Sequence, residues 1–200
     1  MNPIEQKFIN NNYASTYGEL TRQGLNSLLN NKNLKNKTFY DLGSGKGNVV
    51  LYAAIDYPQL KKCNGIEFHD ERHNEALINL QHTQNLKPQV NFIHGDILKQ
   101  NLSDGDFFYI SNLCFNQPTN QKIFNKLKKE LKQNATVFCS RPICNKKVKP
   151  NKTVKQTWWD NSDIYEYKKI GNKLVSTNKK NTTYKLKKNK TKKIKKQKKN

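Results

Sequence analysis

The feature that most restricts how this chain can fold is a glycine-rich segment, DLGSGKG, at residues 41–47. Residues 38–42 predict a short strand, and apolar residues at helical spacing follow the glycines until Pro58. Glycines at alternate positions let the backbone turn sharply from a strand into a helix and approach a ligand closely. This order of strand, glycine loop and helix indicates an α/β fold with a ligand at the turn.

The alternation of strand and helix repeats along the chain. We expect further strands at 63–67, 90–93, 106–112 and 135–140, and helices at 19–29, 70–84 and 118–131. Strands separated by helices form parallel sheets, so the predicted fold class is α/β, with a doubly wound, mostly parallel, Rossmann-like sheet. Two later segments, 154–159 and 164–170, are joined by a polar turn and predict a C-terminal antiparallel β addition at the sheet edge.

Charge and apolar content divide the chain into an N-terminal segment 1–36, a folded domain 37–170 and a tail 171–200. The net charge is +22, and no acidic residue follows Glu166. We expect the Lys-rich tail to be disordered when free and to bind polyanions, above all nucleic acid. A compositional bias toward Lys and Asn is the alternative, but it explains the absence of acidic residues from the tail less well.

Other classes of protein are disfavoured by what the sequence lacks. We expect no secretory signal and no membrane partner, since no apolar run is long enough. The four cysteines form no C-x-x-C pair, so we expect no metal site. Their simplest interpretation is reduced thiols in an intracellular protein.

Polar residues follow the predicted strands at the edge where such sheets bind ligands: Asp41, Glu67, Asp96 and Asn112. The glycine spacing is neither that of dinucleotide folds nor that of a P-loop. Asp41 would repel a phosphate, whereas S-adenosylmethionine carries no phosphate and bears a sulfonium and an ammonium group that carboxylates favour. The ordered motifs DLGSGKG, GIE and GD therefore predict an S-adenosylmethionine-dependent methyltransferase. A dehydrogenase-like or ligand-free relative is the alternative.

Several motifs together resemble the nucleosomal histone lysine methyltransferases of the DOT-one (disruptor of telomeric silencing) type, which are class I methyltransferases. The motifs are YGEL, FYDLGSGKGNVVLYAA, ISNLCF, CSRPIC and TWW…YEY, and they span residues 17 to 167. The glycine motif is generic to methyltransferases, while YGE, the Asn-x-x-Phe segment and TWW…YEY are more specific. The chain departs from the family at Lys46, where an apolar residue is usual, at Asn48, which replaces a glutamine, and in its short N-terminal region.

The resemblance implies a set of site residues. Tyr17, Gly18 and Glu19 match the loop that folds over the cofactor, Glu67 matches the acid on the ribose, and Asp96 with Ile97 would border the adenine. The full set expected to bind S-adenosylmethionine is Tyr17, Gly18, Glu19, Asp41, Gly43, Ser44, Gly45, Asn48, Glu67, Asp96, Ile97 and Asn112. Asn112 matches the asparagine at the methyl-transfer point, and Trp158 and Tyr165 keep the spacing of the residues that line the lysine channel.

The expected reaction is methyl transfer to a lysine nitrogen, which must arrive neutral although its ordinary pKa is near 10.4. An aromatic channel of Trp158, Tyr165 and Phe115 would lower that pKa by desolvation, so water can take the proton without a strong base. The amide oxygen of Asn112 would hold the amine. Ordinary packing is the alternative for each of these side chains.

The function expected from these observations is methylation of a nucleosomal histone lysine by a nuclear, chromatin-associated enzyme whose tail binds DNA. Two alternatives are methylation of a non-histone protein lysine and methylation of an exocyclic base amine in RNA or DNA. Residues 112–115 share Asn-x-x-aromatic with the base-modifying enzymes but lack their Pro-Pro. A third is a nucleic-acid-binding protein with an inactive methyltransferase fold, against which the intact Asp41, Glu67 and Asn112 argue.

Overall fold

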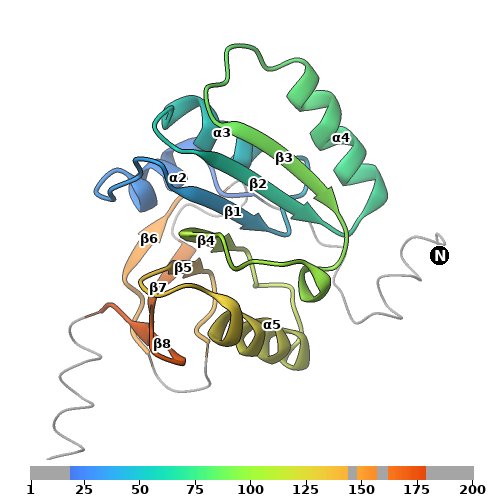
Figure 1. Ribbon diagram of the computed structural model, residues 1–200. Coiled ribbons are helices and arrows are strands. Elements are labelled where there is room, and N and C mark those ends of the chain that lie inside the picture. Colours follow the sequence, from blue (N-terminus) through green and yellow to red (C-terminus); the bar gives the residue numbers. More distant parts are fainter. Residues whose placement is uncertain (1–18, 144–147, 157–161, 179–200) are drawn as a thin grey trace, which may run out of the picture.

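The computed structural model describes residues 19–143, 148–156 and 162–178, which build one mixed sheet of eight strands in the order β3-β2-β1-β4-β5-β7-β6, with β8 paired to β7 (Figure 1). The strands are β1 Thr38–Leu42, β2 Lys62–Glu67, β3 Gln89–His94, β4 Phe107–Ile110, β5 Thr136–Cys139, β6 Lys152–Val154, β7 Ser162–Ile170 and β8 Lys173–Ser176. The first five run parallel, so their carboxyl ends meet at one edge, while β7 runs antiparallel to β5, β6 and β8.

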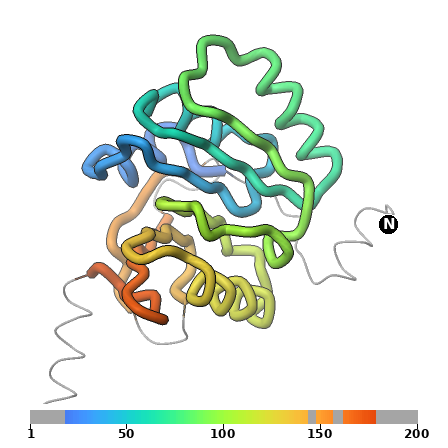
Figure 2. The backbone as a smooth tube through the Cα atoms, in the orientation of Figure 1, coloured from blue at the N-terminus to red at the C-terminus, as the bar shows by residue number. Residues whose placement is uncertain are grey.

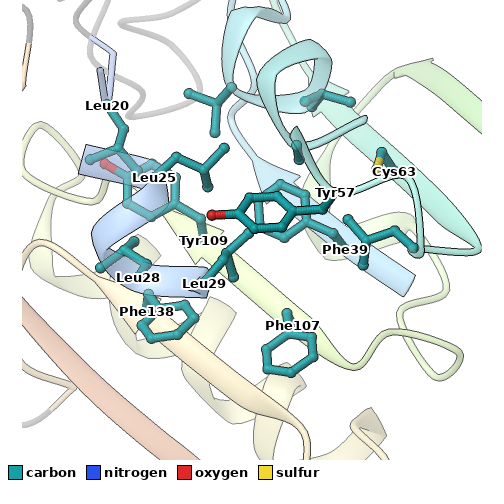
Figure 3. Packing of buried hydrophobic residues seen from close by; sticks show 14 of the residues in the cluster. Leu20, Leu25, Leu28, Leu29, Phe39, Tyr57, Cys63, Phe107, Tyr109 and Phe138 are labelled. Carbon is teal, nitrogen blue, oxygen red and sulfur yellow. The ribbon is translucent and has the colours of Figure 1, made fainter. Parts of the chain in front are cut away.

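Helices cover both faces of the sheet. They are α2 Arg22–Leu29, α3 Asn48–Asp56, α4 Asp70–Gln81 and α5 Gln117–Glu130, together with the short 3-10 helix η1 Ile97–Lys99. Side chains alternate along β1, so Phe39 joins the apolar core beneath α2 and α3, whereas Tyr40 joins the core beneath α5. Figure 3 shows the first core, in which Tyr109 and Phe138 of the sheet lie with Leu25 and Leu28 of α2.

The expected α/β fold, with a mostly parallel sheet and a C-terminal antiparallel addition, is confirmed. The first helix begins at Arg22 and not at residue 19, because Thr21 caps it: Thr21 Oγ1 accepts a hydrogen bond from Gly24 N at 3.1 Å. Gly47, Gly43 and Gly45 all have positive φ, which explains why the turn from β1 into α3 contains glycines.

The C-terminal addition differs from the expected hairpin. The expected strand at 154–159 corresponds to β6 at 152–154, and residues 157–161 lie outside the described residues. Ser162 and Asp163, expected in the turn, belong to β7, which lies between β5 and β6. The unexpected strand β8 lies in the segment assigned to the tail, so the sheet continues to Ser176. These strands, in orange and red, lie far from β3, in green (Figure 2).

In the described ranges, no helix combines the length and apolar character needed to cross a membrane.

Candidate active site

The glycine loop is held over the end of β2. The amides of Gly43 and Ser44 both donate to the carbonyl oxygen of Ile66, at 2.8 and 3.0 Å, and Gly47 N donates to Ser44 O at 2.9 Å. A Cβ atom at Gly47 would collide with the Phe92 ring of β3. The loop therefore packs against the sheet by its backbone, and a side chain at position 47 would lift it away.

Glu67, at the carboxyl end of β2, ties the loop to the neighbouring turns. Its Oε2 accepts from Gly45 N and its Oε1 from His69 N, both at 2.8 Å, and its backbone oxygen accepts from Gly95 N at 2.8 Å. Only 7% of Glu67 is exposed. Each carboxylate oxygen has a further lone pair, so Glu67 can still accept hydrogen bonds from a ligand.

Three acidic side chains meet beside the loop. Asp41 is buried, and its pKa is raised well above its ordinary value by burial and by the negative charges of Glu19 and Glu67. Glu19 is in turn held by Asn48, whose Nδ2 donates to its Oε2 at 2.7 Å. The structure thus brings together four expected cofactor residues from three parts of the chain, around residues 19, 41–48 and 67.

The chemistry of this set fits S-adenosylmethionine. A cationic ligand next to Asp41 would offset the carboxylate repulsion that raises its pKa, whereas a phosphate would add to that repulsion. Glu19, Asp41 and Glu67 are the residues that would hold the ammonium, sulfonium and ribose parts of the cofactor. Among the described residues, no group of three or more His, Cys, Asp or Glu side chains could hold a metal ion.

The expected adenine-side residues follow β3. Asp96 caps η1, with its Oδ1 accepting from Leu98 N at 2.8 Å, and Ile97 is 9% exposed within the core beneath α5. Since the preceding Gly95 is bonded to Glu67, both residues lie at the edge of the sheet that carries the glycine loop.

Asn112, just after β4, is fully buried and held by hydrogen bonds. Its Oδ1 accepts from Arg141 N at 2.8 Å, and its Nδ2 donates to Asn120 Oδ1 at 2.9 Å and to Arg141 O at 3.4 Å. An asparagine amide has two donors and two acceptor lone pairs. Both donors are therefore used, and one lone pair on Oδ1 is left for another donor.

Tyr165 lies in β7 opposite Cys139, the last residue of β5, and therefore near the same edge of the sheet. Burial and the nearby Asp163 carboxylate raise the pKa of its phenol, so the hydroxyl is protonated at neutral pH. Tyr165 is half-buried and packs against the core beneath α5.

Tyr17, Gly18 and Trp158 lie outside the described residues. The chain next to them is described, and an antiparallel bridge joins Leu20 to Gln156. The segment that follows the expected cofactor loop therefore lies beside the segment that precedes the expected channel tryptophan.

Sequence reasoning missed two groups of polar residues. Asn120, in the first turn of α5, belongs to no motif and gave no local signal. The buried hydroxyl of Tyr109 lies close to Ser111 and Ser140, and Gln156 Nε2 donates to Ser140 Oγ at 3.4 Å, while Gln156 Oε1 has no hydrogen-bond partner among the described residues. A tyrosine within the apolar run of β4 was the signal available, because a buried hydroxyl usually finds a partner.

Known proteins that resemble this chain are methylation enzymes, in agreement with a site that fits S-adenosylmethionine. A family model described as histone methylation protein DOT1 matches residues 6–188. A relative from Saccharolobus islandicus (strain REY15A), named protein-lysine N-methyltransferase, is 32% identical over 101 residues. That match covers 49% of this chain and 58% of the relative, so it spans somewhat more than half of the relative's length.

Solved structures share the fold at low identity. The mitomycin 7-O-methyltransferase MmcR has a TM-score of 0.50 at 15% identity, covering 59% of this chain and 35% of its own. A Methanococcus maripaludis protein described as an S-adenosyl-L-methionine-dependent methyltransferase also has a TM-score of 0.50, at 16% identity over 68% of this chain and 58% of its own. With the match over residues 6–188 and a site that fits S-adenosylmethionine as cofactor, the chain belongs to the DOT1 family of histone methylation proteins.

Proposed function

We propose that this chain is an S-adenosylmethionine-dependent protein lysine N-methyltransferase that acts on a nucleosomal histone. The observation that carries the proposal is that one family match, over residues 6–188, includes both the acidic glycine-loop site and the segment with Trp158 and Tyr165. The relative named protein-lysine N-methyltransferase supports the same class of acceptor.

The residues have separate tasks in this proposal. The cofactor supplies a methyl group on a sulfonium, which is ready for displacement by an amine. The carboxylates of Asp41 and Glu67 hold the cofactor, and the remaining lone pair of Asn112 Oδ1 accepts an N–H of the lysine amine. Tyr165 and Trp158 desolvate that amine and lower its pKa, so that the neutral form is present.

The C-terminal tail is proposed to bind DNA next to the site. Residues 179–200 contain twelve lysines and no acidic residue. The strand before them pairs Ser176 with Tyr167, and Thr177 N donates to Glu166 O at 3.0 Å. The lysines therefore follow directly from a point beside the part of β7 that carries Tyr165, where a bound polyanion would lie near the acceptor.

A non-histone protein lysine is the second candidate acceptor. The Saccharolobus islandicus relative is named for a protein lysine without mention of a histone, which favours this alternative. Methylation of a base amine in RNA or DNA has weaker support, because residues 112–115 lack the Pro-Pro of base-modifying enzymes, although the Lys-rich tail suits RNA or DNA as well as a nucleosome.

The test is transfer of labelled methyl groups to nucleosomes, free core histones, RNA and DNA, side by side, with the full chain. We expect label on a histone lysine in nucleosomes.

In the variant Asn112→Ala, we expect turnover to fall much more than cofactor affinity, because the lost contact orients the amine. Label on nucleic acid, or none on histones in either form, would exclude the histone proposal.

A further inference from the structure

Asn120 connects three parts of the loop between β4 and α5. Its Oδ1 accepts from Asn112 Nδ2 at 2.9 Å, while its own Nδ2 donates to the backbone oxygens of Phe115 and Asn116, at 2.9 and 3.2 Å. One amide side chain thus closes the loop that runs from Asn112 to the start of α5.

The side-chain hydrogen bonds of Asn120 are not needed to initiate α5. Asn116 is already the N-cap of α5, with its side chain accepting from Thr119 N at 2.9 Å, and the backbone of Asn120 makes the usual helical hydrogen bond to Asn116 O at 3.0 Å. Helix initiation is therefore satisfied by Asn116 and the backbone. Two of the three side-chain contacts of Asn120 go to Asn112 and Phe115.

The contact with Asn112 decides what that residue can offer a substrate. Arg141 occupies one acceptor position and one donor position of the Asn112 amide, and Asn120 occupies the other donor. With both donors engaged, the amide can only accept a hydrogen bond from a ligand. If Asn120 were absent, the free N–H of Asn112 would compete for the place of the amine.

We propose that Asn120 is a positioning residue for methyl transfer, which fixes Asn112 as an acceptor and sets the position of Phe115. It acts through these residues, because its side-chain hydrogen bonds go to Asn112, Phe115 and Asn116 and not to the carboxylates of Glu19, Asp41 or Glu67. This inference rests on the proposed function for the role of Asn112 in catalysis.

The test uses three variants of the full chain. Asn120→Ala removes all three side-chain contacts, while Asn120→Asp keeps an acceptor for Asn112 Nδ2 but loses the donor to the backbone oxygens of Phe115 and Asn116. Asn125→Ala is the matched control, because Asn125 is an exposed asparagine on the same helix that contacts only Gln121 among the interactions described.

We expect Asn120→Ala to lower kcat on nucleosomes by about ten- to a hundredfold while S-adenosylmethionine affinity changes by less than about twofold, because misplacement of a reacting group affects the chemical step. Asn120→Asp should recover part of the activity, because it keeps the contact with Asn112 and loses those with Phe115 and Asn116, and Asn125→Ala should match the wild type. In NMR spectra, the side-chain amide protons of Asn112 should exchange faster in Asn120→Ala than in Asn120→Asp.

Two results would overturn the proposal. One is wild-type kcat in Asn120→Ala; the other is a parallel loss of kcat, cofactor affinity and melting temperature in both Asn120 variants, which would indicate a purely structural role. If the wild-type chain methylates no acceptor, the proposed function fails. The exchange of the Asn112 amide protons then decides separately whether Asn120 holds that side chain, and unchanged exchange refutes the proposal.

Discussion

The protonation of Asp41 makes the stability of the cofactor-free protein depend on pH. Burial, Glu19 and Glu67 raise its pKa well above the ordinary value of 3.8. Between the ordinary and the raised pKa, the folded state keeps a proton that the unfolded chain has released, so the free energy of unfolding falls as pH rises through this window. A cation beside Asp41 favours its charged form and therefore binds more tightly as pH rises.

The predicted variant is Asp41→Asn, which keeps the shape and removes the charge. We expect it to flatten the pH dependence of the melting temperature, to stabilise the cofactor-free protein at neutral pH, and to weaken S-adenosylmethionine binding. Thermal unfolding between about pH 4 and pH 8 and calorimetric titration measure these effects. Wild-type cofactor affinity in Asp41→Asn would show that the carboxylate is no part of the binding site.

Glu67 gives a second prediction for a single residue. Glu67→Ala should weaken S-adenosylmethionine binding by about 1–3 kcal/mol, the usual loss for a hydrogen-bonded charged partner. Part of the loss comes from the glycine loop, since Gly45 N and His69 N lose their acceptor. Glu71→Ala, at an exposed position in α4, is the control and should bind normally in the same calorimetric titration. Equal affinities for the two variants would place the cofactor elsewhere.

Among the elements, α2 depends on a close approach at Gly24. A Cβ there would lie 2.6 Å from Lys155 O and 2.6 Å from Leu20 Cδ1. Alanine in a helix is intrinsically better than glycine by about 1 kcal/mol, so propensity alone predicts stabilisation by Gly24→Ala. We expect destabilisation instead, because the contact atom on Lys155 is backbone and α2 must move away, which weakens the bridge from Leu20 to Gln156.

Urea unfolding of Gly24→Ala measures the sign of this effect. Gln23→Ala is the control at the neighbouring exposed position, where alanine also has the higher helix propensity, though by less than over glycine, and where no such collision is expected. A stabilised Gly24→Ala protein would mean that α2 and the segment at 155 are not packed as tightly as the structure shows.

For the whole molecule, the uneven charge distribution predicts how substrate binding depends on salt. Twelve of the lysines lie in residues 179–200, a segment with only three large apolar residues. Each lysine that contacts a phosphate releases a counterion, so the logarithm of DNA affinity should fall linearly with the logarithm of salt concentration. Deleting residues 179–200 should make the dependence of DNA affinity on salt less steep. It should also reduce methylation of nucleosomes, while leaving cofactor binding unchanged.

A full-length variant with these lysines changed to glutamine is the control for chain length, and it should behave like the deletion. The measurements are a salt titration of DNA binding and methyl transfer to nucleosomes and to free histones. An unchanged salt slope in both variants would assign DNA binding to lysines of the folded domain.

The sequence by itself determined the parts of the protein that have local signals. Alternating strands and helices predicted β1 to β5, and the glycine loop with Asp41 and Glu67 predicted the cofactor, because periodicity and glycine spacing act over a few residues. The motifs around Asn112 and Trp158 indicated the family. The loss of apolar residues beyond residue 170 hid β8, whose four residues are too few to show a period.

Only the tertiary structure decided how these parts meet. It placed β7 between β5 and β6, joined Thr21 to Lys155 across 134 positions of the sequence, and held Asn112 by Arg141 from 29 positions away. Such hydrogen bonds form between groups that chain folding brings together, and a polar side chain carries no local pattern that names its distant partner. For that reason Asn120 resembled any surface asparagine until the loop around Asn112 had closed on it.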